Sequence, residues 1–208
     1  EGLLLEYTGD ALVLKDGEIK TYPALSWLEE YPYPKLGVTF EAFLTSGGAS
    51  TLPYFLKGKV KNYEYKTLRY KGHYEHIALL NRLGFLDQEP LFKYPVVSVS
   101  PLQMTERILL PLINFPNDPD FVVVDVLIQG EKDGKAKNVK VGLFELNDPE
   151  SGIMAMERCT GYTAAVVMEK LAFTDCPSGV FTMEEFIDPE EFVQTLLPKR
   201  GIIATMTY

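Results

Sequence analysis

The chain has 208 residues, of which 46% are apolar and 24% are charged, a composition typical of globular proteins. Its net charge is −9 and no patch of Lys and Arg alternates with aromatic residues, so we expect no nucleic-acid partner. No apolar run reaches the length of a transmembrane helix and no secretory signal is recognisable, so we expect no membrane partner and a cytoplasmic location.

The first part of the chain predicts short strands joined by tight turns. Residues 11–22 alternate like a β-hairpin, with Asp16-Gly17 as its turn. Residues 31–35 contain two prolines and predict a rigid extended connector, whereas residues 38–44 alternate like a strand. A flexible Ser-Gly-Gly loop follows, and residues 51–57 predict a short helix with Pro53 in its first turn.

The most informative stretch runs from a strand through a glycine turn into a helix. Residues 60–70 predict a polar strand rich in tyrosine, and Gly72 predicts the turn after it. The helix that follows carries an apolar stripe and ends at Gly84, where a left-handed cap is expected. The stripe consists of Ile77, Leu79, Leu80 and Leu83.

The second half predicts two further helices around a long hairpin. Ser100-Pro101 predicts the start of a helix over residues 102–113. The apolar residues 121–128 and residues 139–146 predict a hairpin that turns at Asp133-Gly134. A helix over residues 155–171, a helix that starts at Asp188-Pro189 and stops at Gly201, and a strand over 202–208 complete the chain. Hairpins mixed with helices favour an α+β, or mixed α/β, fold.

Several catalytic motifs are absent from the sequence. It has no glycine-rich dinucleotide fingerprint, P-loop, GxSxG elbow or HExxH pair. Its two histidines, His73 and His76, could share a helix face, but no third ligand is near, so we expect no metal. A surface pair at a helix start is the simpler interpretation, and His73 alone could hydrogen-bond a substrate. Cys159 and Cys176 are read as reduced thiols.

Three further features each have two interpretations. Arg69 is either a surface ion pair or a planar fork that binds a substrate carboxylate. Thr160-Gly161 either allows close helix packing or begins a helix whose free N–H groups face an anion or cofactor. The tyrosines between residues 54 and 74, with Tyr63 and Tyr65 on one strand face, suit a subunit interface as well as a ligand site.

Four segments in order resemble the saccharopine dehydrogenase and lysine 6-dehydrogenase family. They are the opening Gly2-Leu3-Leu4-Leu5-Glu6-Tyr7-Thr8, Ser50-Thr51-Leu52-Pro53-Tyr54, the turn Arg69-Tyr70-Lys71-Gly72-His73, and the helix around Cys159-Thr160-Gly161-Tyr162-Thr163-Ala164-Ala165. Gly179-Val180 followed by Glu184-Glu185 is similar to the closing segment of that family. Lys71 and Thr163 replace prolines of the family pattern, and Cys159 replaces a threonine. The turn is closest to that of lysine 6-dehydrogenase.

The resemblance implies a piece of a longer dehydrogenase. Its fold would be a largely antiparallel sheet with helices on one face, like the C-terminal domain of glyceraldehyde-3-phosphate dehydrogenase. Residues 1–172 would bind substrate and dimerise, and residues 173–208 would pack on a Rossmann domain that this chain does not include. Family members carry that domain N-terminally and use NAD or NADP; because this chain lacks the fingerprint, we expect neither to bind it tightly.

The same resemblance implies site residues and partners. Thr67, Arg69, Tyr70 and His73 would bind an amino-acid substrate such as lysine or saccharopine, and Thr160 and Gly161 would lie near the cofactor. The catalytic acid or base is not assigned. A homodimer is expected. Two alternatives stay open: the saccharopine reductase branch, and a non-catalytic module that dimerises through its sheet and tyrosines.

Overall fold

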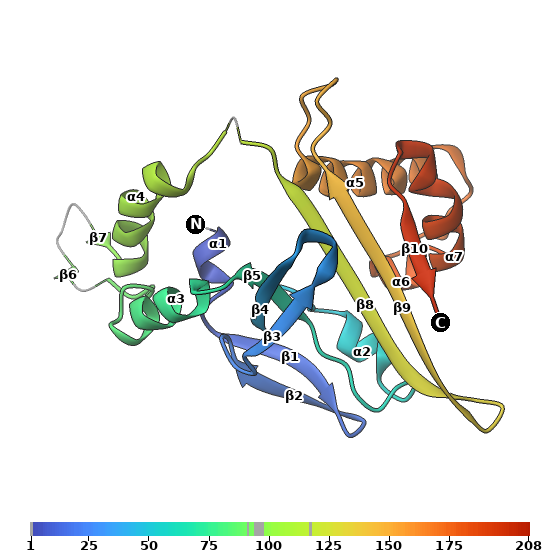
Figure 1. The fold of residues 1–208 in the computed structure, drawn as a ribbon, viewed down its shortest axis with the longest axis horizontal. Helices are drawn as coiled ribbons and strands as arrows, with labels where there is room; N and C mark the ends of the chain where they lie inside the picture. Colours follow the sequence, from blue (N-terminus) through green and yellow to red (C-terminus); the bar gives the residue numbers. More distant parts are fainter. Residues whose placement is uncertain (1, 91, 94–97, 117) are drawn as a thin grey trace. The chain divides into compact units, whose positions relative to one another are not determined.

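A computed structural model describes residues 2–90, 92–93, 98–116 and 118–208 (Figure 1). The chain divides into two compact units, Glu1–Asn114 and Phe115–Tyr208. In each of the four described sheets the paired strands run antiparallel, and helices accompany them in both units. The predicted mixed α and β class with largely antiparallel pairing is therefore confirmed. The expected division at residue 172, between a substrate-binding part and a part that packs on a Rossmann domain, stays a prediction.

The first unit contains short helices and strands that alternate along the chain. Its strands form a β1-β2 hairpin, a three-stranded sheet in the order β3-β4-β5, and a short β6-β7 pair. The elements are α1 (Gly2–Leu5), β1 (Asp10–Lys15), β2 (Glu18–Pro23), β3 (Glu29–Tyr33), β4 (Val38–Leu44), α2 (Leu52–Leu56), β5 (Lys66–Tyr70), α3 (His73–Arg82), β6 (Phe92–Lys93), β7 (Ser98–Val99) and α4 (Pro101–Ile113).

Two predictions about the β3-β4-β5 sheet need correction. The expected connector over residues 31–35 is in part β3, which pairs with β4 as an edge strand. An edge position tolerates Pro32, because the N–H that proline lacks can face away from the partner strand. The expected strand over 60–70 is regular only in β5, since Tyr63 instead makes an isolated bridge to Leu14 of β1.

Helix α3 is held at both ends by specific hydrogen bonds. At its start, one carboxylate oxygen of Glu41 on β4 accepts from the N–H of Gly72 and the other from the N–H of Tyr74, both at 2.9 Å. At its end, the N–H of Gly84 donates to Asn81 and that of Phe85 to Leu80. Gly84 has φ +80°, so the predicted left-handed helix end is confirmed.

The apolar stripe predicted for α3 is only half buried. Ile77 is 8% exposed and Leu80 packs on the same core, whereas Leu79 and Leu83 are 46% and 63% exposed. The helix therefore packs on the core through Ile77 and Leu80, which lie one and two turns after its start. The core that it joins contains Leu4, Tyr7, Leu25, Phe43, Ile77, Leu86 and Leu102, residues drawn from several elements of the first unit.

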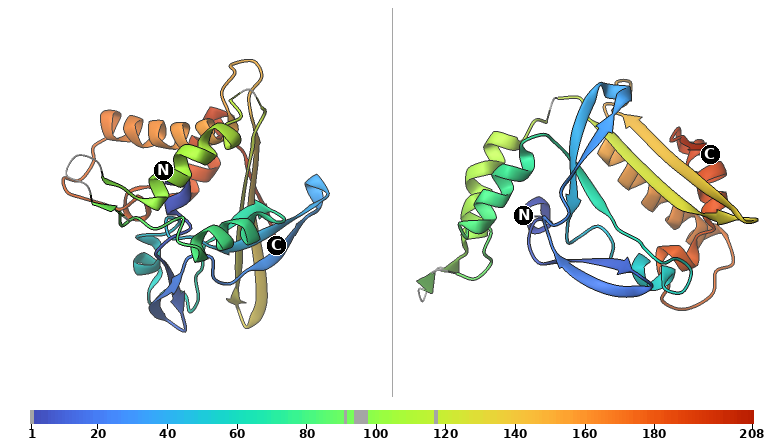
Figure 2. Two further views of the ribbon diagram at one scale, coloured as in Figure 1. Left: turned by 90° about the vertical axis from the view of Figure 1, so that its left-hand side faces the viewer. Right: turned by 60° about the horizontal axis from the view of Figure 1, so that its bottom comes forward.

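The second unit is built on a long hairpin (Figures 1 and 2). Its sheet has the order β10-β9-β8, and α5 lies against one face of it. The predicted hairpin and the helix at residues 155–171 are confirmed, each somewhat longer than expected. The elements are β8 (Phe121–Lys132), β9 (Lys135–Leu146), α5 (Ala155–Phe173), α6 (Met183–Phe186), α7 (Pro189–Glu191) and β10 (Ala204–Thr207), with a short π-helical segment (Phe192–Leu196) after α7.

Polar contacts from the hairpin fix α5. The two carboxylate oxygens of Asp120 accept from the N–H groups of Ala155 and Met156, which begin the helix. One turn later, Arg158 forms an ion pair with Glu145 of β9 and donates to the carbonyl of Leu146 at 3.1 Å. Glu145 is 8% exposed, so this pair stabilises the helix against the sheet only while both charges are present. Among the described residues, no helix is long and apolar enough to span a membrane.

Replacing Glu41 by Gln is expected to destabilise the first unit by about 1 kcal/mol, because one of the two N–H acceptors at the start of α3 is lost. Burial alone would raise the pKa of Glu41, but the N–H donors of Gly72 and Tyr74 outweigh it and lower the pKa below 4.5. The stabilisation is therefore present above pH 4.5 and lost as the pH falls through the lowered pKa.

Urea unfolding followed by circular dichroism between pH 3 and pH 7 measures this. Glu30→Gln is the matched control, since Glu30 lies opposite Glu41 in the neighbouring strand but, among the described residues, forms an ion pair only with the exposed Lys71. Equal effects of the two substitutions, or an acid dependence that is unchanged in Glu41→Gln, would contradict the capping role.

Candidate functional site

Three side chains from separate elements meet in the first unit. Tyr7, just after α1, is completely buried. Its hydroxyl oxygen accepts from Nε of Arg69 on β5 at 2.8 Å, and it lies 3.0 Å from Nε2 of His73, the first residue of α3. The rings of Tyr7 and His73 are 5.5 Å apart. The structure thus brings together two of the predicted substrate-binding residues, Arg69 and His73, through a tyrosine hydroxyl.

The backbone explains why these groups converge. In the sheet, Arg69 lies directly opposite Glu41, so both side chains leave the same face. Gly72, at φ +94°, then turns the chain from β5 into α3, a conformation that a residue with a Cβ rarely adopts. The carboxylate of Glu41 holds this turn and thereby places His73 over the face that carries Arg69.

Arg69 keeps part of its hydrogen-bonding capacity free. Nε donates to Tyr7, and Nη1 donates to the carbonyl of Leu68 at 3.1 Å. Nη2 lies 3.6 Å from Oε2 of Glu6, too far for a hydrogen bond. A guanidinium has five N–H groups, so within the described structure most of them have no acceptor. The side chains of Arg69 and Glu6 are 28% and 41% exposed, which leaves the outer end of the guanidinium accessible.

Burial shifts the pKa values of His73 and Tyr7 in opposite directions. Burial lowers the pKa of His73 below 6.5, and the positive charge of Arg69 lowers it further, while Glu41 opposes the shift. Its position at the start of α3 acts in the same direction, since the positive end of a helix dipole disfavours an imidazolium. Burial raises the pKa of Tyr7 above 10.0, although Arg69 opposes this.

The other two predicted substrate-binding residues have different surroundings. Thr67 faces the same side of β5 as Arg69 but is buried, and its hydroxyl pairs with that of Thr45 at 2.9 Å. Tyr70 faces the opposite side, where its ring lies 5.5 Å from that of Phe40. Strand alternation therefore separates Tyr70 from the group around Arg69. A ligand could contact both side chains only if it extended from one face of the sheet to the other.

Thr160 and Gly161 lie inside α5. The helix begins at Ala155, so the interpretation that it starts at Thr160 is wrong. Backbone N–H groups beyond the first turn are already donated within a helix. Gly161 is exposed, and a Cβ built on it would meet nothing within 4 Å, so close packing does not explain this glycine either. We find no structural reason for it in the described residues.

Sequence reasoning assigned no role to Tyr7, Glu6 or Glu41. The first two lie in the opening segment, which drew attention only through the family resemblance, and Glu41 lies in a strand identified by its apolar alternation. The sequence pattern marks none of the three, because Glu41 falls with Thr39 at the polar positions that alternate with Val38, Phe40 and Ala42.

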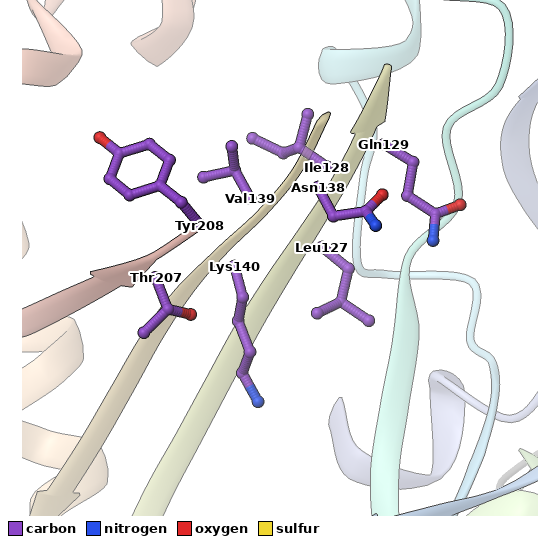
Figure 3. Close-up of a pocket in the computed structure, with 8 residues that line it drawn as sticks. All are labelled: Leu127, Ile128, Gln129, Asn138, Val139, Lys140, Thr207 and Tyr208. Carbon is purple, nitrogen blue, oxygen red and sulfur yellow. The ribbon is translucent and has the colours of Figure 1, made fainter. Parts of the chain in front are cut away.

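A shallow hollow occurs in the second unit (Figure 3). It lies at the turn end of the β8–β9 hairpin, beside the end of β10, and its lining includes Leu127, Ile128, Val139, Lys140 and Tyr208. Apart from Lys140 it offers no ionised side chain, and the carboxylate of Asp125 already binds that lysine at 2.7 Å. No group of three or more His, Cys, Asp or Glu residues that could hold a metal occurs in the part of the chain that the structure describes. The Tyr7–Arg69–His73 cluster is therefore the stronger candidate.

Comparison with known proteins gives a consistent picture. The sequence model of one family, described as the saccharopine dehydrogenase C-terminal domain, matches residues 1–202. Carboxynorspermidine synthases of Vibrio cholerae and Vibrio alginolyticus are 27% and 25% identical to the chain, each over 96% of the chain and 48% of the relative. The chain thus spans about half the length of these relatives.

A similar solved structure is the apo saccharopine dehydrogenase (L-Glu forming) of Saccharomyces cerevisiae. Its TM-score is 0.67 at 18% identity, over 99% of the chain and 60% of that protein. At this identity the likeness shows a shared fold. It agrees with the fold that the sequence resemblance implied.

We expect NMR titration to give His73 a pKa below 6.5, because burial and the charge of Arg69 both disfavour its imidazolium. Arg69→Gln should raise that pKa but leave it below 6.5, since burial remains. A pKa at or above 6.5 in the unaltered chain would contradict the described site. Because the folded-state pKa is the lower one, the contribution of His73 to stability is full above pH 6.5 and is lost as the pH falls below it.

Proposed function

The chain belongs to the saccharopine dehydrogenase C-terminal domain family, and on that premise we propose that it is the substrate-binding and dimerisation domain of an NAD(P)-dependent dehydrogenase that acts on a carboxylated amine. The single observation that carries this proposal is the partly free guanidinium of Arg69 beside the imidazole of His73, both hydrogen-bonded to Tyr7. A fixed arginine fork suits a carboxylate, and a neutral histidine can hydrogen-bond an amine or carbonyl without repelling a cation.

Glu6 gives the site a second charge. Its carboxylate lies 3.6 Å from Arg69 and is partly exposed, so a substrate carboxylate can approach the guanidinium only by sharing it with Glu6. The same carboxylate can accept from a substrate ammonium. A ligand that carries both a carboxylate and an amine therefore complements the pair better than either group alone.

Three substrates fit this description. Lysine is the one that the sequence of the turn favours, and would make the parent enzyme a lysine 6-dehydrogenase. Saccharopine is suggested by the family and by the yeast structure. Carboxynorspermidine, by its name a carboxylated polyamine, is suggested by the two Vibrio relatives. We place it first because those relatives are 27% and 25% identical to the chain, against 18% for the yeast structure.

We assign no nicotinamide-binding site to the described residues. Thr160 and Gly161, expected near it, lie within α5 with their N–H groups in the helix, and the sequence has no glycine-rich fingerprint. We therefore propose that this chain holds and orients the amine.

A second role rests on β8. This strand is at the edge of its sheet in the described structure, and four of its apolar side chains are about half exposed or more: Val124 (48%), Val126 (47%), Leu127 (60%) and Ile128 (51%). An edge strand of this length and apolarity needs cover. A second copy, paired across a two-fold axis, is the occupant that we propose, because such an interface is self-complementary. If the chain dimerised in this way but took no part in a reaction, it would be the non-catalytic interaction module that the sequence left open as an alternative.

Arg69→Lys in the parent enzyme is expected to reduce kcat/KM by about tenfold or more, about 1.4 kcal/mol, because lysine cannot reproduce the planar fork. Lysine, saccharopine and carboxynorspermidine should be assayed in parallel with NAD and NADP. Arg82→Lys, on the exposed end of α3, is the control and should leave the rates unchanged. Unchanged kinetics in both Arg69→Lys and Arg69→Ala would remove Arg69 from the site.

Light scattering at tens of micromolar is expected to give the mass of a dimer. Val126→Lys should return a monomer, because it places a charge in the apolar strand edge. Glu89→Lys, at an exposed position after α3 and outside β8, is the control for a change of charge alone and should remain dimeric. A monomeric mass for the unaltered chain would count against the proposed interface.

A further inference from the structure

We propose that Tyr7 is a positioning residue that fixes His73 in the tautomer with its proton on Nδ1, and so presents that N–H to the ligand. The tautomer itself follows from the hydrogen bonds of the free chain, whereas its use in catalysis rests on the proposed function. The two can therefore be tested apart.

The argument begins with the hydroxyl of Tyr7, which has one proton to donate. An arginine can only donate, so in the contact with Nε of Arg69 the tyrosine oxygen is the acceptor. The one other hydrogen-bond contact of this hydroxyl in the described structure is Nε2 of His73 at 3.0 Å. Tyr7 is completely buried, so an O–H without an acceptor would leave a buried donor unsatisfied, which is unfavourable. The proton therefore points to Nε2.

The opposite assignment is less favourable. If Nε2 of His73 carried the proton, the tyrosine oxygen would accept from both Arg69 and His73, and its own proton would have no acceptor in a buried site. An imidazolium would do the same and would add a second cation beside Arg69. The charged groups that face His73 are Arg69 on β5, Glu41 on β4 and His76 on α3, and only the carboxylate of Glu41 favours the charged form.

Fixing Nε2 as the acceptor determines the other ring nitrogen. A neutral imidazole has one N–H and one bare nitrogen, so Nδ1 of His73 carries the proton. Nδ1 has no hydrogen-bond partner among the described residues, and the side chain is only partly buried. An N–H in this position is a donor held ready for an oxygen or an unprotonated amine of the ligand.

This arrangement differs from a purely structural role for Tyr7. A tyrosine that served only to fill the core would be replaced well by phenylalanine, which keeps the ring packing against Phe43 and His73. A positioning tyrosine loses its effect on the imidazole when only its oxygen is removed. Tyr7→Phe therefore separates the two roles.

The tautomer can be read by nitrogen-15 NMR of the histidine side chains, because a bare ring nitrogen and a protonated one differ widely in chemical shift. The chain has two histidines, so His76→Gln leaves one set of signals, that of His73. At pH 8 we expect a bare Nε2 and a protonated Nδ1. A protonated Nε2 in this chain overturns the proposal without any change at Tyr7, so the test does not depend on whether a Tyr7 variant folds.

In the same background, Tyr7→Phe should move His73 toward the Nε2–H tautomer that free histidine prefers. Tyr54→Phe is the control, since Tyr54 is 61% exposed on α2, and it should leave the spectrum unchanged. A folded Tyr7→Phe variant that keeps the proton on Nδ1 also overturns the proposal.

Kinetics of the parent enzyme test the functional part. Tyr7→Phe should lower kcat by about tenfold or more with a smaller change in KM, if His73 hydrogen-bonds the reacting group. An Nδ1–H tautomer together with unchanged kcat would confirm the network and remove His73 from the reaction. A parent enzyme inactive on all three amines would refute the proposed function and leave the NMR result standing.

Discussion

The buried hydroxyl of Tyr7 is the constraint on which the candidate site depends. An O–H group inside a core must find partners in the protein, and this one finds them on β5 and at the start of α3. The same ring belongs to the main apolar cluster of the first unit. Tyr7 therefore both packs in the core and hydrogen-bonds Arg69 and His73. These contacts connect the opening segment of the chain to β5 and α3.

Glu41 fixes the backbone around His73, as Tyr7 fixes its side chain. Its two oxygens take the N–H groups on either side of His73, so the turn after β5 cannot open without leaving a carboxylate and two donors unpaired. Tyr7 orients the side chain of His73 and Glu41 orients its backbone. A ligand would thus meet a histidine that has little freedom to lose on binding, which is the condition for efficient positioning.

The two units of the chain carry different features. The first unit gathers the ionisable groups of the candidate site, whereas the second presents a long apolar hairpin with a helix on one face. Neither has the glycine-rich turn that a dinucleotide needs. The proposed roles of these residues are binding of an amine and association with a second copy.

The sequence alone determined the features that depend on neighbours in the chain. The hairpin turns at Asp16-Gly17 and Asp133-Gly134, the cap at Ser100 and the helix end at Gly84 all follow from local dihedral preferences and local hydrogen bonds. The structure confirms each of them. The family resemblance also identified the fold and singled out the turn that carries Arg69 and His73.

Only the tertiary structure decided which distant residues complete the site. Tyr7 lies 62 positions from Arg69, and Glu41 lies 31 positions from Gly72, so no periodicity or spacing connects them. The family resemblance grouped Tyr70 with Arg69, although strand alternation turns Tyr70 to the other face, against Phe40. Side-chain partners across a core are selected by how strands pair and helices dock, and these long-range contacts leave no local pattern in the sequence.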